Sequence, residues 1–119
     1  MLVVGEHLLG EVDPMWVRMC TGLAAGVGFS RQELCGALSA SVLLIGALYG
    51  RSDLLQTHDR ATQAAARCRE RFQAVWGATH CAPIRDQVAS GGQPKPCTQV
   101  VERAVLILLE VLDEEAQRG

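Results

Sequence analysis

The sequence predicts an all-α fold: a compact single-domain bundle of about five helices with a buried central helix at residues 34–50. The chain has 119 residues, a usual length for one domain, and 49% of them are apolar, which is enough for a hydrophobic core. Aromatic residues make up only 4%, whereas sheets favour aromatic and β-branched side chains. Apolar residues recur at spacings of three and four, the period of a helix with one buried face. We therefore expect one helical domain over residues 1–119.

Two helices are expected in the N-terminal quarter. The apolar segment 2–9 predicts a short helix that ends near Gly10 and resembles the remainder of a longer, truncated helix. Asp13 and Pro14 then form an N-cap followed by proline at the first helical position, where its missing N–H costs nothing. We expect this second helix to run to about residue 25 and to stop at Gly26.

The central helix is predicted from a capping box and from small residues. Ser30 and Glu33 form the S-x-x-E pattern that opens a helix, and Gly50 marks its end. Its many Gly, Ala and Ser residues allow neighbouring helices to approach closely. The uncharged run 34–50 is too short and too rich in small residues to span a membrane, so no membrane insertion is expected.

The fourth helix is expected to begin at Asp53 and to end at Gly77, with His58 on its apolar face as a core or interface histidine. Its other apolar positions follow a three–four spacing. They are Leu54, Ala61, Ala65, Cys68, Phe72 and Val75.

The C-terminal third is expected to hold a short helix at 83–88, a flexible loop at about 89–96 and a last helix from near 96 to about 115. Apolar residues cover more than one face of the last helix. Such a wide stripe indicates either deep burial or a subunit contact, so a homodimer through the C-terminal helix is one expectation.

The charges argue against several classes of partner. Lys and Arg total 11 against 13 for Asp and Glu, a net charge of -2, so no nucleic-acid partner is expected. The arginines at 67, 69 and 71 and the acidic run 113–115 are expected on solvated faces.

The N-terminus has no basic region and carries Glu6 early, unlike a secretory signal. We therefore expect a cytoplasmic protein, in which five cysteines indicate free thiols, redox chemistry or metal binding.

Two cysteines are placed where thiols become reactive. Cys81 and Cys97 begin the last two predicted helices, and the partial positive charge of a helix N-terminus stabilises a thiolate. Cys35 lies early in the central helix but beyond its predicted first turn, where this effect is weaker. Cys20 and Cys68 fall on apolar faces and are expected to pack in the core.

Three segments, 22–28, 33–40 and 44–50, together carry a resemblance to a family. Cys35-Gly36-Ala37, with Ala40 in place of the closing glycine, is similar to the Cys-Gly-Ala-x-x-Gly motif of the redox-active C-GCAxxG-C-C proteins. The resemblance implies a small helical fold whose later two cysteines correspond to Cys81 and Cys97. The family's first cysteine has no counterpart here upstream of Cys20.

Three functions remain open at this point. In a redox protein, Cys81 would be the attacking thiolate, Cys97 its resolving partner and Cys35 a tuning group, acting on a redox partner protein. Alternatively, Cys35, Cys81, Cys97 and His80 offer a tetrahedral zinc set, or the thiolates an iron–sulfur cluster, although the sequence requires no cofactor. The third possibility is a non-enzymatic helical scaffold, dimeric and with structural cysteines, that binds a partner or ligand.

Overall fold

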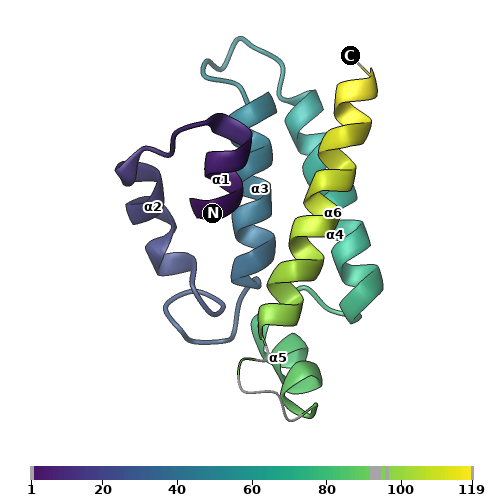
Figure 1. Ribbon diagram of the computed structural model, residues 1–119. Helices are drawn as coiled ribbons and strands as arrows, with labels where there is room; N and C mark the ends of the chain where they lie inside the picture. Colours follow the sequence, from purple (N-terminus) through teal and green to yellow (C-terminus); the bar gives the residue numbers. More distant parts are fainter. Residues whose placement is uncertain (1, 92–94, 96, 119) are drawn as a thin grey trace.

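The computed structural model describes residues 2–91, 95 and 97–118. The described part holds six α-helices and one short 3-10 helix, and so confirms the all-α prediction (Figure 1). In chain order they are α1 (Leu2–Leu9), α2 (Pro14–Cys20), η1 (Thr21–Leu23), α3 (Gly36–Tyr49), α4 (Asp59–Trp76), α5 (Cys81–Ala89) and α6 (Cys97–Arg118). None of these helices combines the length and the apolar character that crossing a membrane requires.

The core lies where α3, α4 and α6 pack against one another (Figure 1). Its largest side chains include Phe72 of α4, Leu38 and Ile45 of α3 and Leu108 of α6, each at most 1% exposed. The expected central position of the 34–50 segment is confirmed, because α3 contacts both long helices. On α4 the burial of Cys68 and Phe72 follows their predicted spacing, whereas Val75 is 39% exposed.

The helices α1 and α2 lie on the other side of α3 (Figure 1). The α2 helix begins as predicted, since the Asp13 carboxylate accepts a hydrogen bond from the Met15 amide at 2.8 Å. None of its residues is buried, and with α1 and α3 it borders an apolar groove of about 400 Å³. The lining residues are Leu9, Trp16, Met19, Cys20, Leu23, Leu43, Leu44 and Ala47.

The expected junction between the second and third helices is wrong. The α2 helix ends at Cys20, and α3 begins at Gly36. Between them the chain adopts a left-handed backbone at several positions, Ala25, Gly26, Val27, Gly28, Phe29 and Arg31. The Ser30 hydroxyl stabilises this loop, since it donates to the Gly26 carbonyl at 2.7 Å and accepts from the Gln32 amide at 3.2 Å. The S-x-x-E pattern therefore caps no helix, because its serine hydroxyl closes a turn instead.

The expected start of the fourth helix is also wrong. The Asp53 carboxylate accepts from the Leu55 amide at 2.9 Å, which makes a local turn of the kind that competes with helix formation. The helix begins six residues later, so Leu54 is 83% exposed in the preceding loop. His58 is the exposed N-cap residue and belongs to neither core nor interface within this chain. The predicted end is confirmed, because Gly77 takes a φ of +70° at the C-terminus of α4.

The last two predicted helices are confirmed, with α5 starting two residues earlier than expected and α6 ending three residues later. Of the loop expected to be flexible, residues 92–94 and 96 lie outside the described residues. That expectation therefore stays a prediction.

Glu114 and Glu115 of the C-terminal acidic run pair with arginines of α4, which corrects the expectation that both groups are solvated, whereas Arg69 and Asp113 are exposed as expected. The Glu115 side chain is only 2% exposed and accepts from Arg67 and, at 3.0 Å, from Arg60. Arg71 donates to both carboxylate oxygens of Glu114. These long-range pairs join α4 to the end of α6, which is why the carboxylate tolerates burial.

Candidate functional site

Cys35 and Cys81 are brought together by a short piece of extended chain. The residues Leu34 and His80 form an isolated antiparallel β-bridge. The Cys35 amide donates to the Thr79 carbonyl, and the Cys81 amide donates to the Glu33 carbonyl, both at 2.9 Å. In this register the two cysteines are diagonal neighbours on one face of the bridge, opposite to the face of Leu34 and His80.

The glycine-rich loop before α3 packs against the β-bridge and forms hydrogen bonds with the residues beside it. The Ala82 amide donates to the Arg31 carbonyl at 3.0 Å, and the Glu33 amide donates to the Gly26 carbonyl at 3.2 Å. Gly26 is buried with a φ of +73°, and a Cβ atom at this position would lie 2.7 Å from the Cβ of Cys81. Only glycine fits both the left-handed backbone and the close approach. The glycine-rich segment therefore positions a site cysteine directly.

All three predicted site cysteines stand at helix N-termini. Cys81 and Cys97 are the first residues of α5 and α6, and Cys35 is the N-cap residue of α3. The expectation that Cys35 lies beyond the first turn is thus wrong, because α3 starts later than the capping pattern suggested. Each thiol sits at the end of a helix where unpaired amides and the dipole favour negative charge. A helix N-terminus by itself favours the thiolate form of a cysteine, and at Cys35 burial opposes this effect.

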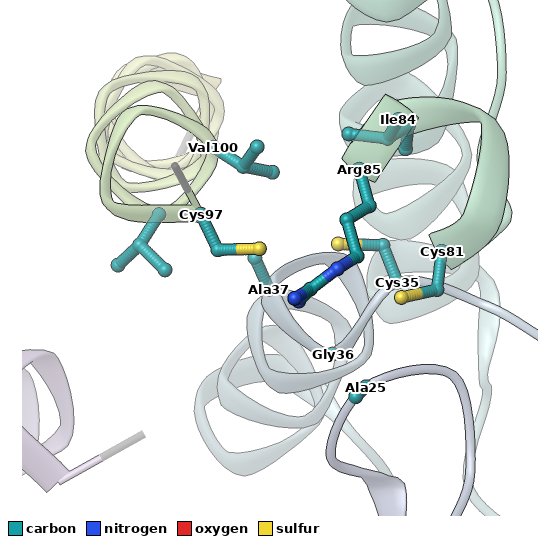
Figure 2. Close-up of a pocket in the computed structure, with 10 residues that line it drawn as sticks. Ala25, Cys35, Gly36, Ala37, Cys81, Ile84, Arg85, Cys97 and Val100 are labelled. Atoms are coloured by element: carbon teal, nitrogen blue, oxygen red, sulfur yellow. The ribbon is translucent and has the colours of Figure 1, made fainter. Parts of the chain in front are cut away.

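The three cysteines line one cavity of about 220 Å³. Its other lining residues are Ala25, Gly36, Ala37, Ile84, Arg85, Val100 and Val101. Figure 2 shows the sulfurs of Cys35, Cys81 and Cys97 directed into this common space from three different elements. Arg85 extends from α5 toward the same space. The sequence-predicted set of thiols is therefore gathered at one end of the bundle.

The thiols differ in their accessibility and acidity. Cys35 and Cys81 are buried, with exposed fractions of 9% and 7%, whereas Cys97 is exposed. Burial raises the pKa of the Cys35 thiol above its ordinary value, and the neighbouring Cys81 and Cys97 thiols raise it further. The amides of Ala37 and Leu38 act in the opposite direction on that pKa, as expected for a helix N-terminus. Cys35 therefore stays protonated at neutral pH.

Metal binding receives no support from the donor geometry. His80 is exposed and does not line the cavity, and its Nδ1 lies 3.4 Å from the Thr79 hydroxyl. Within residues 2–91, 95 and 97–118, no group of three or more His, Cys, Asp or Glu side chains is arranged to hold a metal ion. A tetrahedral zinc site needs four donors around one point, and the bridge directs His80 to the face opposite Cys35 and Cys81.

The remaining cysteines are separate from the site. Cys68 is 1% exposed among core residues of α4, and burial raises the pKa of its thiol. Cys20 is partly buried and lines the apolar groove beside α2. The expected packing role thus fits the location of Cys68, whereas Cys20 lies at the surface of the bundle.

Arg85 is a cavity residue that was not predicted from the sequence. It stands four residues after Cys81 in α5, and residues four apart share one face of a helix. That spacing is the signal that could have placed its guanidinium beside the thiols.

Comparison with known proteins gives one match. The family model described as "Putative redox-active protein (C_GCAxxG_C_C)" matches residues 1–111, nearly the whole chain. No curated protein and no solved structure matches the chain. The matched region includes all three cavity cysteines.

Proposed function

Since the chain belongs to the C-GCAxxG-C-C family of redox-active proteins, we propose that it carries out thiol–disulfide exchange through Cys97 and Cys81. One observation carries this proposal: three thiols from three helix N-termini are directed into a single cavity (Figure 2). Helix N-termini stabilise thiolates, and the thiolate is the nucleophile in exchange reactions. Two thiols beside the attacking one offer a resolving partner.

The exposure of the thiols supports an order of attack opposite to the sequence-based one. From the sequence, Cys81 was expected to be the attacking thiolate and Cys97 the resolving thiol. Cys97 is the exposed thiol, whereas Cys81 is buried. An incoming disulfide meets the exposed sulfur first, because exchange depends on access as well as on thiolate character. Cys97 is therefore the attacking group in this proposal, and Cys81 is the resolving group.

The exchange proceeds in two balanced steps. The Cys97 thiolate attacks one sulfur of the substrate disulfide, a mixed disulfide forms, and the other half of the substrate leaves as a thiolate that takes up a proton. Cys81 then loses its proton to solvent and attacks the Cys97 sulfur, which releases the second half as a thiol. The protein has lost two electrons and the substrate disulfide has gained them. A partner dithiol protein returns the oxidised pair to its reduced state by the reverse steps.

Cys35 is a supporting thiol in this account. It is fixed to Cys81 by the bridge, and the usual α-carbon separation of such diagonal neighbours, about 7–8 Å, exceeds that of most disulfides. Its raised pKa also keeps it protonated at neutral pH. Cys97 begins a different helix and is not held by the bridge, so Cys81 and Cys97 form the better pair.

The test counts the thiols that the reduced protein releases from bis(2-hydroxyethyl) disulfide. The wild-type protein releases two equivalents of 2-mercaptoethanol and ends as an internal disulfide. Cys81→Ser releases one equivalent and gains the mass of one trapped hydroxyethylthio group, whereas Cys97→Ser releases almost none at neutral pH. Cys68→Ser is the matched control, because it removes a buried thiol outside the cavity, and it releases two equivalents.

The same assay distinguishes the alternatives. If wild-type protein releases no thiol and its cysteines react slowly with alkylating agents, the cysteines are packing residues and the helical scaffold is the better account. If Cys97→Ser still releases two equivalents, the order of attack proposed here is wrong.

A further inference from the structure

Among the residues that the structure describes, Arg85 is the one charged side chain lining the cavity between the three thiols. The other lining residues are cysteines, glycine and small or branched apolar residues, and no carboxylate is among them. Arg85 is partly buried, and Figure 2 shows its side chain crossing from α5 toward the space beside the Cys97 and Cys35 sulfurs. A lone cation in an otherwise apolar cavity gives that cavity a preference for negative charge.

The Arg85 guanidinium has no partner in the described part of the chain. The arginines at 60, 67, 71 and 118 each pair with Glu110, Glu114 or Glu115. Among the described residues, by contrast, Arg85 takes part in no ion pair and donates no side-chain hydrogen bond. The guanidinium is a planar, permanently charged fork that binds a carboxylate through two parallel hydrogen bonds. Its donors are available to a bound molecule.

We propose that the cavity accepts a small disulfide with a carboxylate near its sulfur–sulfur bond, and that Arg85 pairs with this carboxylate. This inference rests on the exchange reaction proposed above and adds the chemical class of its substrate. The carboxylate on Arg85 orients the disulfide, so that its sulfur lies at Cys97 and its apolar carbons contact Ala37 and Val100. Electron and proton transfers are those of the exchange reaction, with the anionic disulfide reduced to two thiols.

The test compares three disulfides in which the same two methylene groups join sulfur to a polar group of different charge. They are 3,3′-dithiodipropionate, which is anionic, bis(2-hydroxyethyl) disulfide, which is neutral, and cystamine, which is cationic. For each disulfide we would measure the second-order rate constant for oxidation of the reduced full-length protein. The reaction is quenched with an alkylating agent, and the products are quantified by mass spectrometry. The quantity of interest is the ratio of the anionic to the neutral rate constant, because effects common to all disulfides cancel in it.

In the wild-type protein the anionic disulfide reacts fastest and the cationic one slowest. Arg85→Gln lowers the anionic-to-neutral ratio about tenfold, the effect of losing one charge-assisted contact, and Arg85→Lys restores part of it. Arg69→Gln is the matched control, because it removes the same charge from an exposed position on α4 that does not line the cavity. Its ratio equals that of the wild-type protein.

Four results would overturn the inference. If Arg85→Gln leaves the anionic-to-neutral ratio of rate constants unchanged, Arg85 does not bind the substrate carboxylate. The same conclusion follows if Arg69→Gln lowers this ratio equally. If Arg85→Gln slows the reaction of all three disulfides equally, Arg85 acts on the reactivity of the thiolates and does not bind the substrate. Failure of the neutral disulfide to oxidise wild-type protein would instead overturn the exchange reaction itself, and this inference with it.

Discussion

The Cys81 amide donates a 2.9 Å hydrogen bond to the Glu33 carbonyl, which ties the first residue of α5 to the chain just before α3. The reciprocal bond runs from the Cys35 amide to the Thr79 carbonyl. Two thiols far apart in sequence are thereby held on one face of a single β-bridge. The site depends on this pairing as much as on the helices that carry its cysteines.

Gly26 packs directly against Cys81, so a methyl group at position 26 should disturb both folding and the site. Gly26→Ala combines a left-handed backbone with a contact of 2.7 Å to the Cys81 Cβ, and the overpacking alone costs about 1–3 kcal/mol of unfolding free energy. Gly28→Ala is the control, because it has the same kind of backbone, with a φ of +61°, and no atom within 4 Å. Its cost is about 1–2 kcal/mol. Urea unfolding and the alkylation rate of Cys81 measure the two effects, and equal behaviour of the two variants would refute the close packing.

The accessibility of the thiols predicts an order of alkylation in the native, reduced protein. Cys97 reacts first with iodoacetamide at neutral pH because it is exposed at a helix N-terminus. Cys35 and Cys68 react last, because burial raises the pKa of both thiols and covers both sulfurs. Peptide mass spectrometry over a time course gives the order, and early labelling of Cys35 would contradict it.

The buried Glu115 makes stability depend on pH. Hydrogen bonds from Arg67 and then Arg60 hold the pKa of this carboxyl below its ordinary value. The stabilisation is therefore complete above the ordinary carboxyl pKa and is lost as the pH falls through the lowered one. Glu115→Gln should reduce the unfolding free energy at neutral pH by about 2 kcal/mol, and the difference from wild type should shrink in acid.

Glu110 supplies the control for this experiment. Its side chain is 67% exposed and lies 3.8 Å from Arg71, so Glu110→Gln should change stability by less than about 1 kcal/mol. Urea unfolding at neutral and at acid pH measures both variants. A Glu115→Gln difference that persists unchanged in strong acid would show that the carboxylate charge is not its source.

The homodimer expected from the wide apolar stripe of the last helix stays a prediction. Leu106 and Leu109 of α6 are 54% and 37% exposed within the single chain. If they pack against a second copy, Leu106→Glu shifts the sedimentation coefficient to that of a monomer, because burying an unpaired charge opposes association. Leu55→Glu, at a loop position that is 95% exposed, should leave it unchanged. A wild-type protein that sediments as a monomer at all concentrations would rule the dimer out.

The sequence predicted those elements whose signals are local. The start of α2 was predicted from Asp13 and Pro14, and the end of α4 from Gly77. Both predictions are confirmed, because these residues favour helix ends through their own backbone and side-chain preferences. The burial of Cys68 and Phe72 follows from helical periodicity alone. The placement of Cys81 and Cys97 at the starts of two helices was likewise predicted from the sequence.

What the sequence did not predict depends on partners far along the chain. The chain just before α3 is held by hydrogen bonds with Thr79 and Cys81, so a local capping pattern at Ser30 could not place the start of the helix. Glu115 is buried because Arg67 lies beside it, 48 positions away. A local run of acidic residues predicts a solvated surface, because the run does not show which arginines the fold brings next to it.

The most direct test of the account is to locate the disulfide that forms when the reduced protein is oxidised. The protein is treated with bis(2-hydroxyethyl) disulfide, alkylated under denaturing conditions and digested with trypsin, which separates Cys81 from Cys97 by cleaving after Arg85. The account predicts that the peptides of Cys81 and Cys97 are joined, while Cys20, Cys35 and Cys68 carry the alkyl label. Alkylation of all five cysteines, or a disulfide that involves Cys20 or Cys68, would contradict it.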